Sequence, residues 1–251
     1  MIKLKSKREI QLMREAGKIV AEVLQEMENS VKAGITTAML DKIAEKRIRS
    51  YRAEPAFLGY HNFPASICTS VNNEVVHGIP GLRKLEEGDI ISIDVGVRLQ
   101  GYHGDAAATF AVGRVTPETA HLVDVTRTSL EKAIDAMQSE NRLSDISHAV
   151  QAYVESNSLS VVRNYVGHGI GKDMHEEPQV PNFGQPGHGP VLKPGLALAI
   201  EPMVNAGTWE VKVLKDQWTV VTADGSLSAH FEHTVVLGDN GPEILTSSNR
   251  I

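Results

Sequence analysis

Apolar residues between Ile10 and Met27 recur every three to four positions, the spacing that predicts an amphipathic helix over roughly residues 7–30. Ser6 and Glu9 form a capping-box pattern, so the helix is expected to begin directly after Ser6. Similar capping and breaking signals predict three further helices: from Thr36 or Thr37 to about residue 52, from Thr116 and Pro117 to about 138, and from Ser144 to about 156.

Strand patterns occupy the middle and the last part of the chain. SICTSV (66–71) predicts a short strand, and DIISIDVGV (89–97) and YHGDAAATFAV (102–112) predict a hairpin that turns near RLQG. The last hundred residues show β-type runs joined by long loops: SVVRNYV, ALAIEPMV, EVKVL, WTVVT and AHFEHTVVL.

The two halves of the chain present the same features in the same order. Each contains two predicted helices, then His-Gly-Ile (77–79 and 168–170), then Leu-x-x-Gly-x-x-x-x-Ile followed by an acid, which is Asp94 or Glu201. Leu, Gly and Ile are common, so chance matching is the alternative, but three features in one order favour duplication. We therefore predict a single domain over 1–251, with pseudo-symmetric halves of roughly 1–115 and 116–251 and a site where they meet.

Composition and charge narrow the class of protein. The 251-residue chain is 41% hydrophobic and 22% charged, as in ordinary globular proteins. A net charge of −6 without a basic tract disfavours nucleic acid as the main ligand. One cysteine excludes an internal disulfide, and we expect neither a signal peptide, because MIKLKSKREI is charged throughout, nor a membrane span, because the apolar runs are too short. We expect a soluble, cytoplasmic protein.

Four acids occupy positions that should be apolar. Asp94 and Glu201 each end an apolar run, Glu232 interrupts another, and Asp105 lies on the second arm of the hairpin predicted to carry Asp94. Two carboxylates 4 Å apart repel by about 4 kcal/mol at an effective dielectric near 20, so one is protonated or a cation lies between them. Outward-facing acids on a surface strand would explain any one of these residues, but they explain all four together poorly.

Four carboxylates and one imidazole suit two divalent cations, because the charges then balance. His168 lies in VGHGIG, where we expect the flanking glycines to let the backbone turn sharply and bring the ring to a metal or substrate. An isolated histidine is more often structural, but the glycines and the repeat favour a functional one. The oxygen-rich donor set favours Mn, Fe(II), Co or Mg over a structural zinc ion.

The segments around these five residues closely resemble the methionine aminopeptidases of the type I bacterial form. The matching segments include IDVGVRLQGYHGD, VGHGIGKDMHEEP, AIEPMV and FEHTVV, together with NNEVVHGIPG and KDQWTVVT, so the resemblance covers essentially the whole chain. It implies an α+β fold of the pita-bread type, in which two pseudo-symmetric halves form a curved antiparallel sheet covered by helices.

The resemblance also implies a ligand set and a reaction. Asp94 would bind one of two divalent ions (Co, Mn, Fe(II) or Zn), His168 and Glu201 the other, and Asp105 and Glu232 both. The enzyme would remove the N-terminal methionine from nascent chains with a small second residue, by attack of metal-activated hydroxide on the first peptide bond.

Further residues receive roles from the same resemblance. Glu201 would shuttle the proton, and His77 and His175 would contact the substrate or stabilise the tetrahedral intermediate. Four residues would line the methionine pocket: Tyr60, Phe63, Cys68 and Trp218. Met174, where relatives often have an aromatic residue, and Phe57, often a cysteine in relatives, leave the pocket shape open. Cys68 in the pocket would make the enzyme sensitive to thiol reagents.

Two other hypotheses compete with this one. A pita-bread peptidase of the prolidase type would cleave beside proline, and a metal-free binding module would have lost a ligand, whereas all five are present. Cotranslational work by the family implies proximity to the ribosome, but no docking patch is visible. We expect a monomer without nucleic-acid or membrane partners.

Overall fold

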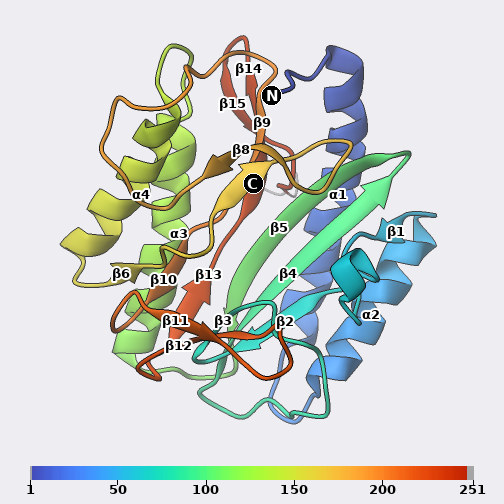
Figure 1. Cartoon of the computed structure of the whole chain (residues 1–251). Coiled ribbons are helices and arrows are strands. Elements are labelled where there is room, and N and C mark those ends of the chain that lie inside the picture. The colour runs from blue at the N-terminus through green and yellow to red at the C-terminus, as the bar shows by residue number, and fades with distance from the viewer. Residues whose placement is uncertain (1, 248–251) are drawn as a thin grey trace.

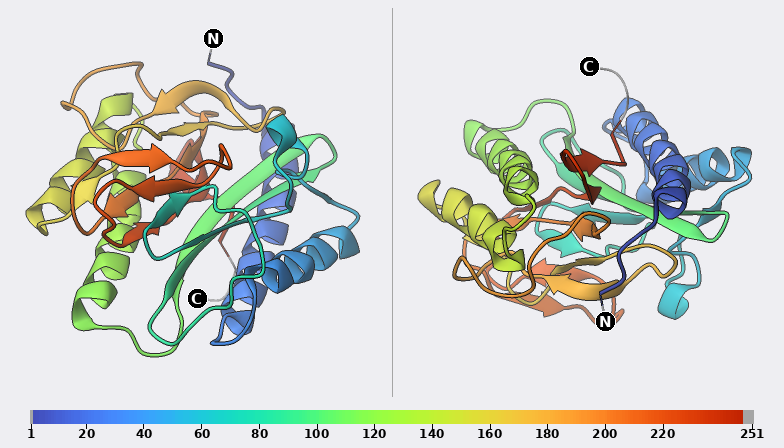
Figure 2. Two further views of the ribbon diagram at one scale, coloured as in Figure 1. Left: turned by 60° about the horizontal axis from the view of Figure 1, so that its bottom comes forward. Right: turned by 90° about the horizontal axis from the view of Figure 1, so that it is seen from above.

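The computed structural model describes residues 2–247 as two helix pairs on opposite flanks of a set of antiparallel strands (Figures 1 and 2). The first pair is α1 (Lys7–Ser30) and α2 (Thr37–Ser50), and the second is α3 (Pro117–Ala136) and α4 (Leu143–Ser156). No helix within residues 2–247 is long and apolar enough to cross a membrane.

The helix boundaries largely follow the predicted caps. The Ser6 amide donates to the Glu9 carboxylate over 2.8 Å, and the Glu9 amide donates to the Ser6 hydroxyl over 3.4 Å, which confirms the capping box. The prediction that Ser144 opens the fourth helix was wrong, because α4 begins at Leu143. The Asp145 carboxylate instead accepts the Arg142 amide over 2.7 Å and closes the first turn.

The predicted hairpin consists of β4 (Ile90–Leu99) and β5 (Tyr102–Ala111). Gln100 and Gly101 both have positive φ, at 50° and 82°, as a tight two-residue hairpin turn requires. β4 also pairs with β1 (Glu54–Pro55) and β2 (Cys68–Val71), so it is buried in the middle of a four-stranded sheet.

Eleven strands form three further sheets, in the orders β15-β14-β9-β7-β8, β13-β10-β6 and β11-β12-β3. Their bounds are β3 (Glu74–Val76), β6 (Ser160–Val161), β7 (Gly167–Gly169), β8 (Glu176–Val180), β9 (Ala197–Ile200), β10 (Met203–Asn205), β11 (Val211–Val213), β12 (Val220–Thr222), β13 (Ser228–His230), β14 (His233–Gly238) and β15 (Gly241–Ile244).

The runs ALAIEPMV and AHFEHTVVL are not the continuous strands that the pattern predicted. The first is split into β9 and β10 around Glu201 and Pro202, and the second into β13 and β14 around Phe231 and Glu232. β9 pairs with β14 in one sheet, and β10 pairs with β13 in another. Both segments therefore pass from one sheet to the other, and the bend in each segment carries its glutamate.

The two copies of the Leu-x-x-Gly pattern have similar backbones at their glycines. Gly88 and Gly195 have φ of 93° and 90°, and each amide donates over 2.8 Å to a carbonyl oxygen further along the chain, that of Val112 and that of Leu237 respectively. One buried cluster joins α1 and α2 to β2, β4 and β5, and a second joins α3 and α4 to β9, β13 and β14. Each helix pair thus covers the strands of its own half.

Candidate active site

A cavity of about 270 Å³ lies between the two halves. Strands of the first half and strands of the second half both contribute to its wall. All eleven site residues predicted from the sequence line it, namely Tyr60, Phe63, Cys68, His77, Asp94, Asp105, His168, His175, Glu201, Trp218 and Glu232.

The first half supplies two carboxylates from its central hairpin. Asp94 is opposite Ala107 and Asp105 is opposite Gly96, so the two acids are diagonal neighbours rather than a directly facing pair. A side-chain hydrogen bond still joins them. Because side chains two residues apart share a strand face, this register points both carboxylates into the cavity.

The second half supplies Glu201, Glu232 and His168. The bend between the two sheets carries both glutamates, and His168 is opposite Ala199 on the neighbouring strand β9. The amide of Glu232 donates to the carbonyl oxygen of Ala107 over 2.9 Å. This backbone contact brings Glu232 to the β5 strand that carries the first-half acid Asp105.

The glycines beside His168 have a different purpose from the one predicted. Neither Gly167 nor Gly169 has positive φ, and both lie in the extended strand β7. A Cβ on Gly167 would lie 2.4 Å from the Ala199 carbonyl oxygen, and one on Gly169 would lie 2.3 Å from the Glu177 carbonyl oxygen. The glycines therefore allow β7 to fit between β8 and β9, and no sharp turn is involved.

Burial raises the pKa of every carboxylate at the cavity floor. It raises the pKa of Asp94 to about 7, against the lowering effect of its hydrogen bond to Asp105. Burial, followed by the charges of neighbouring acids, raises the pKa of the other three well above their usual range: Asp105, Glu201 and Glu232. Like charges this close therefore ionise together only with a compensating cation.

The floor has the donors that a divalent cation needs. One oxygen each of Asp94, Asp105 and Glu232 is buried without a hydrogen-bond partner among the described residues. Ligand atoms of Asp105, His168 and Glu232 lie within 4.8 Å of one another. Buried oxygens of this kind are normally satisfied, so the donor set fits metal binding.

His168 is prepared as a neutral ligand. Its Nδ1 donates to the Gly169 carbonyl oxygen over 2.9 Å, so Nε2 is left toward the carboxylates, 3.6 Å from Glu201 Oε1. Burial, with a smaller contribution from His175, lowers the pKa of His168 to about 3. The imidazole is therefore uncharged at neutral pH, the form that binds metal.

Two other histidines stand nearer the cavity mouth. The exposed His175 accepts a hydrogen bond from the Tyr60 hydroxyl at Nδ1 over 2.7 Å, and its ring centroid is 4.2 Å from that of His168. His77 has φ of 60°, in the left-handed region that side chains avoid. The following Gly78 packs against Thr69, where a Cβ would be 2.1 Å from a carbonyl oxygen.

An aromatic slot adjoins the carboxylates. The Phe63 and Trp218 rings meet edge to face at 5.0 Å, and His77 stands edge-on to Trp218 at 6.1 Å. Phe57 also lines the cavity. The side chains of Phe57 and Met174 both pack over Gly96, because a Cβ added to Gly96 would lie 2.7 Å from each of them. The two side chains thus meet over Gly96, and of the two it is Phe57 that lines the cavity.

The structure argues against the expected thiol sensitivity of Cys68. The side chain is 5% exposed, and burial, followed by the charge of Asp94, raises the pKa of its thiol well above the usual range. Alkylation requires the accessible thiolate, which is scarce under these conditions.

His230 is a site residue that the sequence reasoning missed. It is 2% exposed, its Nε2 has no hydrogen-bond partner among the described residues, and this atom lies 3.7 Å from Glu201 Oε2. The available signal was its position two residues before Glu232. Because the chain bends between them, the sequence alone did not show that both approach Glu201.

Comparison with known proteins identifies the class to which this fold and site belong. The chain is a member of metallopeptidase family M24, whose family model matches residues 11–239. Relatives named methionine aminopeptidase include one from Clostridium acetobutylicum, 58% identical over 247 residues (98% of this chain and 99% of the relative), and one from Bacillus subtilis, 55% identical over 246 residues (98% and 99%).

A solved methionine aminopeptidase from Thermotoga maritima superposes with a TM-score of 0.97 at 48% identity, covering 99% of this chain and all of that one. The pita-bread fold that the resemblance implied is thereby confirmed.

Proposed function

We propose that this chain is a methionine aminopeptidase that uses two divalent cations to remove the N-terminal methionine from polypeptides with a small second residue. One observation carries the proposal: a single cavity joins a floor of four carboxylates and His168 to an apolar aromatic slot. The relatives named as methionine aminopeptidases, which match over nearly the whole chain, support the same activity.

The donor set divides between two cations. Asp94 would hold one, His168 and Glu201 would hold the other, and Asp105 and Glu232 would contribute to both; the gathering of these donors at the cavity floor supports this division. When bound, such cations lower the pKa of water and polarise the carbonyl group of a peptide.

Glu201 is suited to move a proton. Its carboxylate lies at the floor beside His168 and His230, and burial raises its pKa well above the usual value for glutamate. From this position the carboxylate would accept the proton of the attacking water and deliver it to the leaving amine nitrogen. We therefore assign Glu201 as the proton shuttle.

The substrate is held by the residues nearer the mouth. The Tyr60 hydroxyl occupies Nδ1 of His175, so the other ring nitrogen is available to a peptide carbonyl oxygen. The backbone of His77 and the close packing of Gly78 hold His77 rigidly. We therefore assign His77 to stabilise the same peptide carbonyl oxygen as that oxygen gains negative charge. Phe63 and Trp218 form the slot for the methionine side chain.

Cleavage of Met-Ala-Ser by metal-reconstituted protein tests the function, with chelator-treated protein as the control. Ala-Pro and other X-Pro peptides test the prolidase alternative. We expect release of methionine from Met-Ala-Ser only with metal, and no turnover in Glu201→Ala. Preferential X-Pro cleavage, or near-normal activity of Glu201→Ala, would overturn the proposal.

We further propose that the protein acts as a monomer, in the cytoplasm and close to the ribosome. The large exposed apolar side chains of the described residues are few, and this supports a monomer: Leu4, Met39, Leu58, Leu82, Val213 and Leu214. Sedimentation of the purified protein, and its cofractionation with ribosomes from lysate, would test these points.

A further inference from the structure

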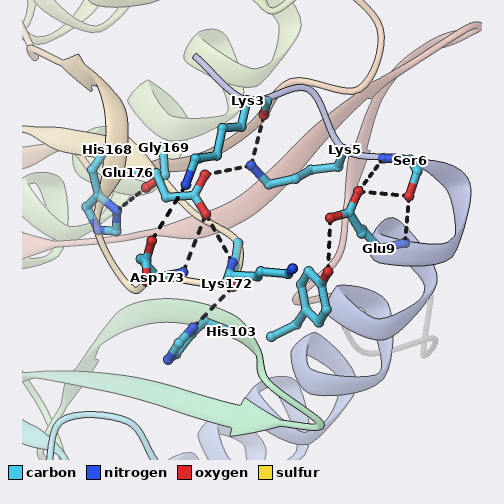
Figure 3. Close-up of polar contacts among 12 residues, drawn as sticks. Lys3, Lys5, Ser6, Glu9, His103, His168, Gly169, Lys172, Asp173 and Glu176 are labelled. Atoms are coloured by element: carbon cyan, nitrogen blue, oxygen red, sulfur yellow. Dashed lines mark hydrogen bonds and ion pairs between the residues drawn. The ribbon is translucent and has the colours of Figure 1, made fainter. Parts of the chain in front are cut away.

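A buried ion pair joins the N-terminal segment to the loop that carries His175 (Figure 3). Lys5 Nζ lies 2.7 Å from Glu176 Oε2, and each side chain is 5% exposed. The two residues are 171 positions apart. We name residues 2–6 the N-terminal strap and residues 171–176 the histidine loop.

Glu176 uses both of its carboxylate oxygens to shape the histidine loop. Oε1 accepts the amide of Lys172 over 3.0 Å and that of Asp173 over 3.4 Å, and Oε2 accepts Lys5. Gly171 lies against the pair, because a Cβ there would be 2.4 Å from Lys5 Cε and 2.7 Å from Glu176 Oε1. The loop is therefore folded around the ion pair.

The strap itself is firmly anchored. The Lys5 amide donates to the Gly195 carbonyl oxygen over 2.6 Å, and Lys5 Nζ also donates to the Lys3 carbonyl oxygen over 2.9 Å. Ser6, the next residue, caps α1. Lys5 is thus fixed between the first helix and the turn before β9, and it offers the loop a rigid cation.

Sequence adjacency and strand pairing connect Glu176 to the cavity histidines His175 and His168. Glu176 pairs with Gly169 across β8 and β7, so each partner in this pair is adjacent in sequence to a cavity histidine, His175 and His168 respectively. A movement of Glu176 would therefore disturb the ring contact between His175 and His168 and the hydrogen bond between His175 and Tyr60.

We propose that Lys5 and Glu176 are positioning residues that hold His175 in its place at the cavity mouth. Without the ammonium group, the Glu176 carboxylate is a buried charge with too few partners, and it turns toward water to recover solvation. That movement releases the amides of Lys172 and Asp173 and displaces His175. The consequence for turnover rests on the proposed function, but the consequence for the loop does not.

The experiment compares Lys5→Met and Lys5→Arg with wild type, using metal-loaded full-length protein. Arg14→Met is the matched control, since Arg14 pairs with Glu243 over 2.7 Å and ties α1 to β15 away from the loop. Hydrogen–deuterium exchange is read at the Lys172 and Asp173 amides, and kcat and KM are measured with Met-Ala-Ser. Metal content is measured throughout.

We expect Lys5→Met to speed exchange at both amides by roughly tenfold or more, because their protection depends on the loop staying closed. The value of kcat should fall by about 10- to 100-fold, as for a misplaced catalytic contact, with metal content unchanged. Lys5→Arg should retain most of the amide protection and most of the wild-type kcat. Arg14→Met should change neither the exchange rates nor kcat. A non-additive loss in Lys5→Met/Glu176→Gln would confirm that the residues act together.

Exchange and kcat in Lys5→Met equal to those of Arg14→Met would overturn the inference. If Lys5→Met does not fold, the isosteric Glu176→Gln replaces it with the same expected results. If Lys5→Met speeds amide exchange but the wild type itself never cleaves Met-Ala-Ser, the proposed function is rejected and the positioning role stands. Normal cleavage by both wild type and Lys5→Met would reject the positioning role alone.

Discussion

The carboxylates of the cavity floor should destabilise the protein when metal is removed, and Asp94→Asn should relieve this. Burial raises the pKa of Asp94 from 3.8 to about 7. A carboxyl group whose pKa is higher in the folded state favours folding below the unfolded value, and this contribution is lost as the pH rises through the folded value. The folded and unfolded pKa values differ by about three, which at 1.36 kcal/mol for each pKa unit amounts to a loss of about 4 kcal/mol once the pH exceeds 7.

Urea unfolding of chelator-treated protein measures the effect. At pH 8 we expect Asp94→Asn to be more stable than wild type by about 4 kcal/mol, and the difference should shrink markedly by pH 5. Saturating Mn²⁺ should reverse the order, because a bound ligand stabilises the folded protein and the variant has lost a donor. Thus a substitution that removes activity is expected to strengthen the metal-free fold.

Asp124→Asn is the control, since Asp124 is exposed on α3 and, within residues 2–247, pairs only with Arg127. Its stability should stay within about 0.5 kcal/mol of wild type at both pH values. If metal-free Asp94→Asn proved no more stable than wild type at pH 8, the buried carboxylates would not repel as the structure implies, and the reasoning would fail.

Three further outcomes are expected. His77→Ala should lower kcat while metal content stays intact, and a large loss of bound metal would reassign His77 as a ligand. Gly167→Ala should weaken metal affinity in a chelator competition, because its Cβ would clash with the Ala199 carbonyl oxygen and push His168 off the floor; unchanged affinity would contradict this. Iodoacetamide should react slowly with Cys68 at pH 7 and leave activity intact, so rapid inactivation would show that the thiol is more accessible than the structure indicates.

Local signals in the sequence were enough for the secondary structure wherever neighbouring residues decide it. The capping box of α1 and the Gln100-Gly101 turn depend on contacts within a few residues, and both are read directly from the chain. The repeat also marked Asp94 and Glu201 as equivalent acids. The resemblance to a known family then added the substrate-contacting and pocket residues, namely Tyr60, Phe63, Cys68, His77, His175 and Trp218.

Tertiary structure decided everything that depends on contacts between distant segments. The bend at Glu201 and Glu232 exists because two strands change sheets together, and no local pattern carries that information. The approach of His230 to Glu201 follows from the same bend. The pairing of Lys5 with Glu176 joins segments 171 residues apart, and its strength depends on burial, which only the folded chain creates.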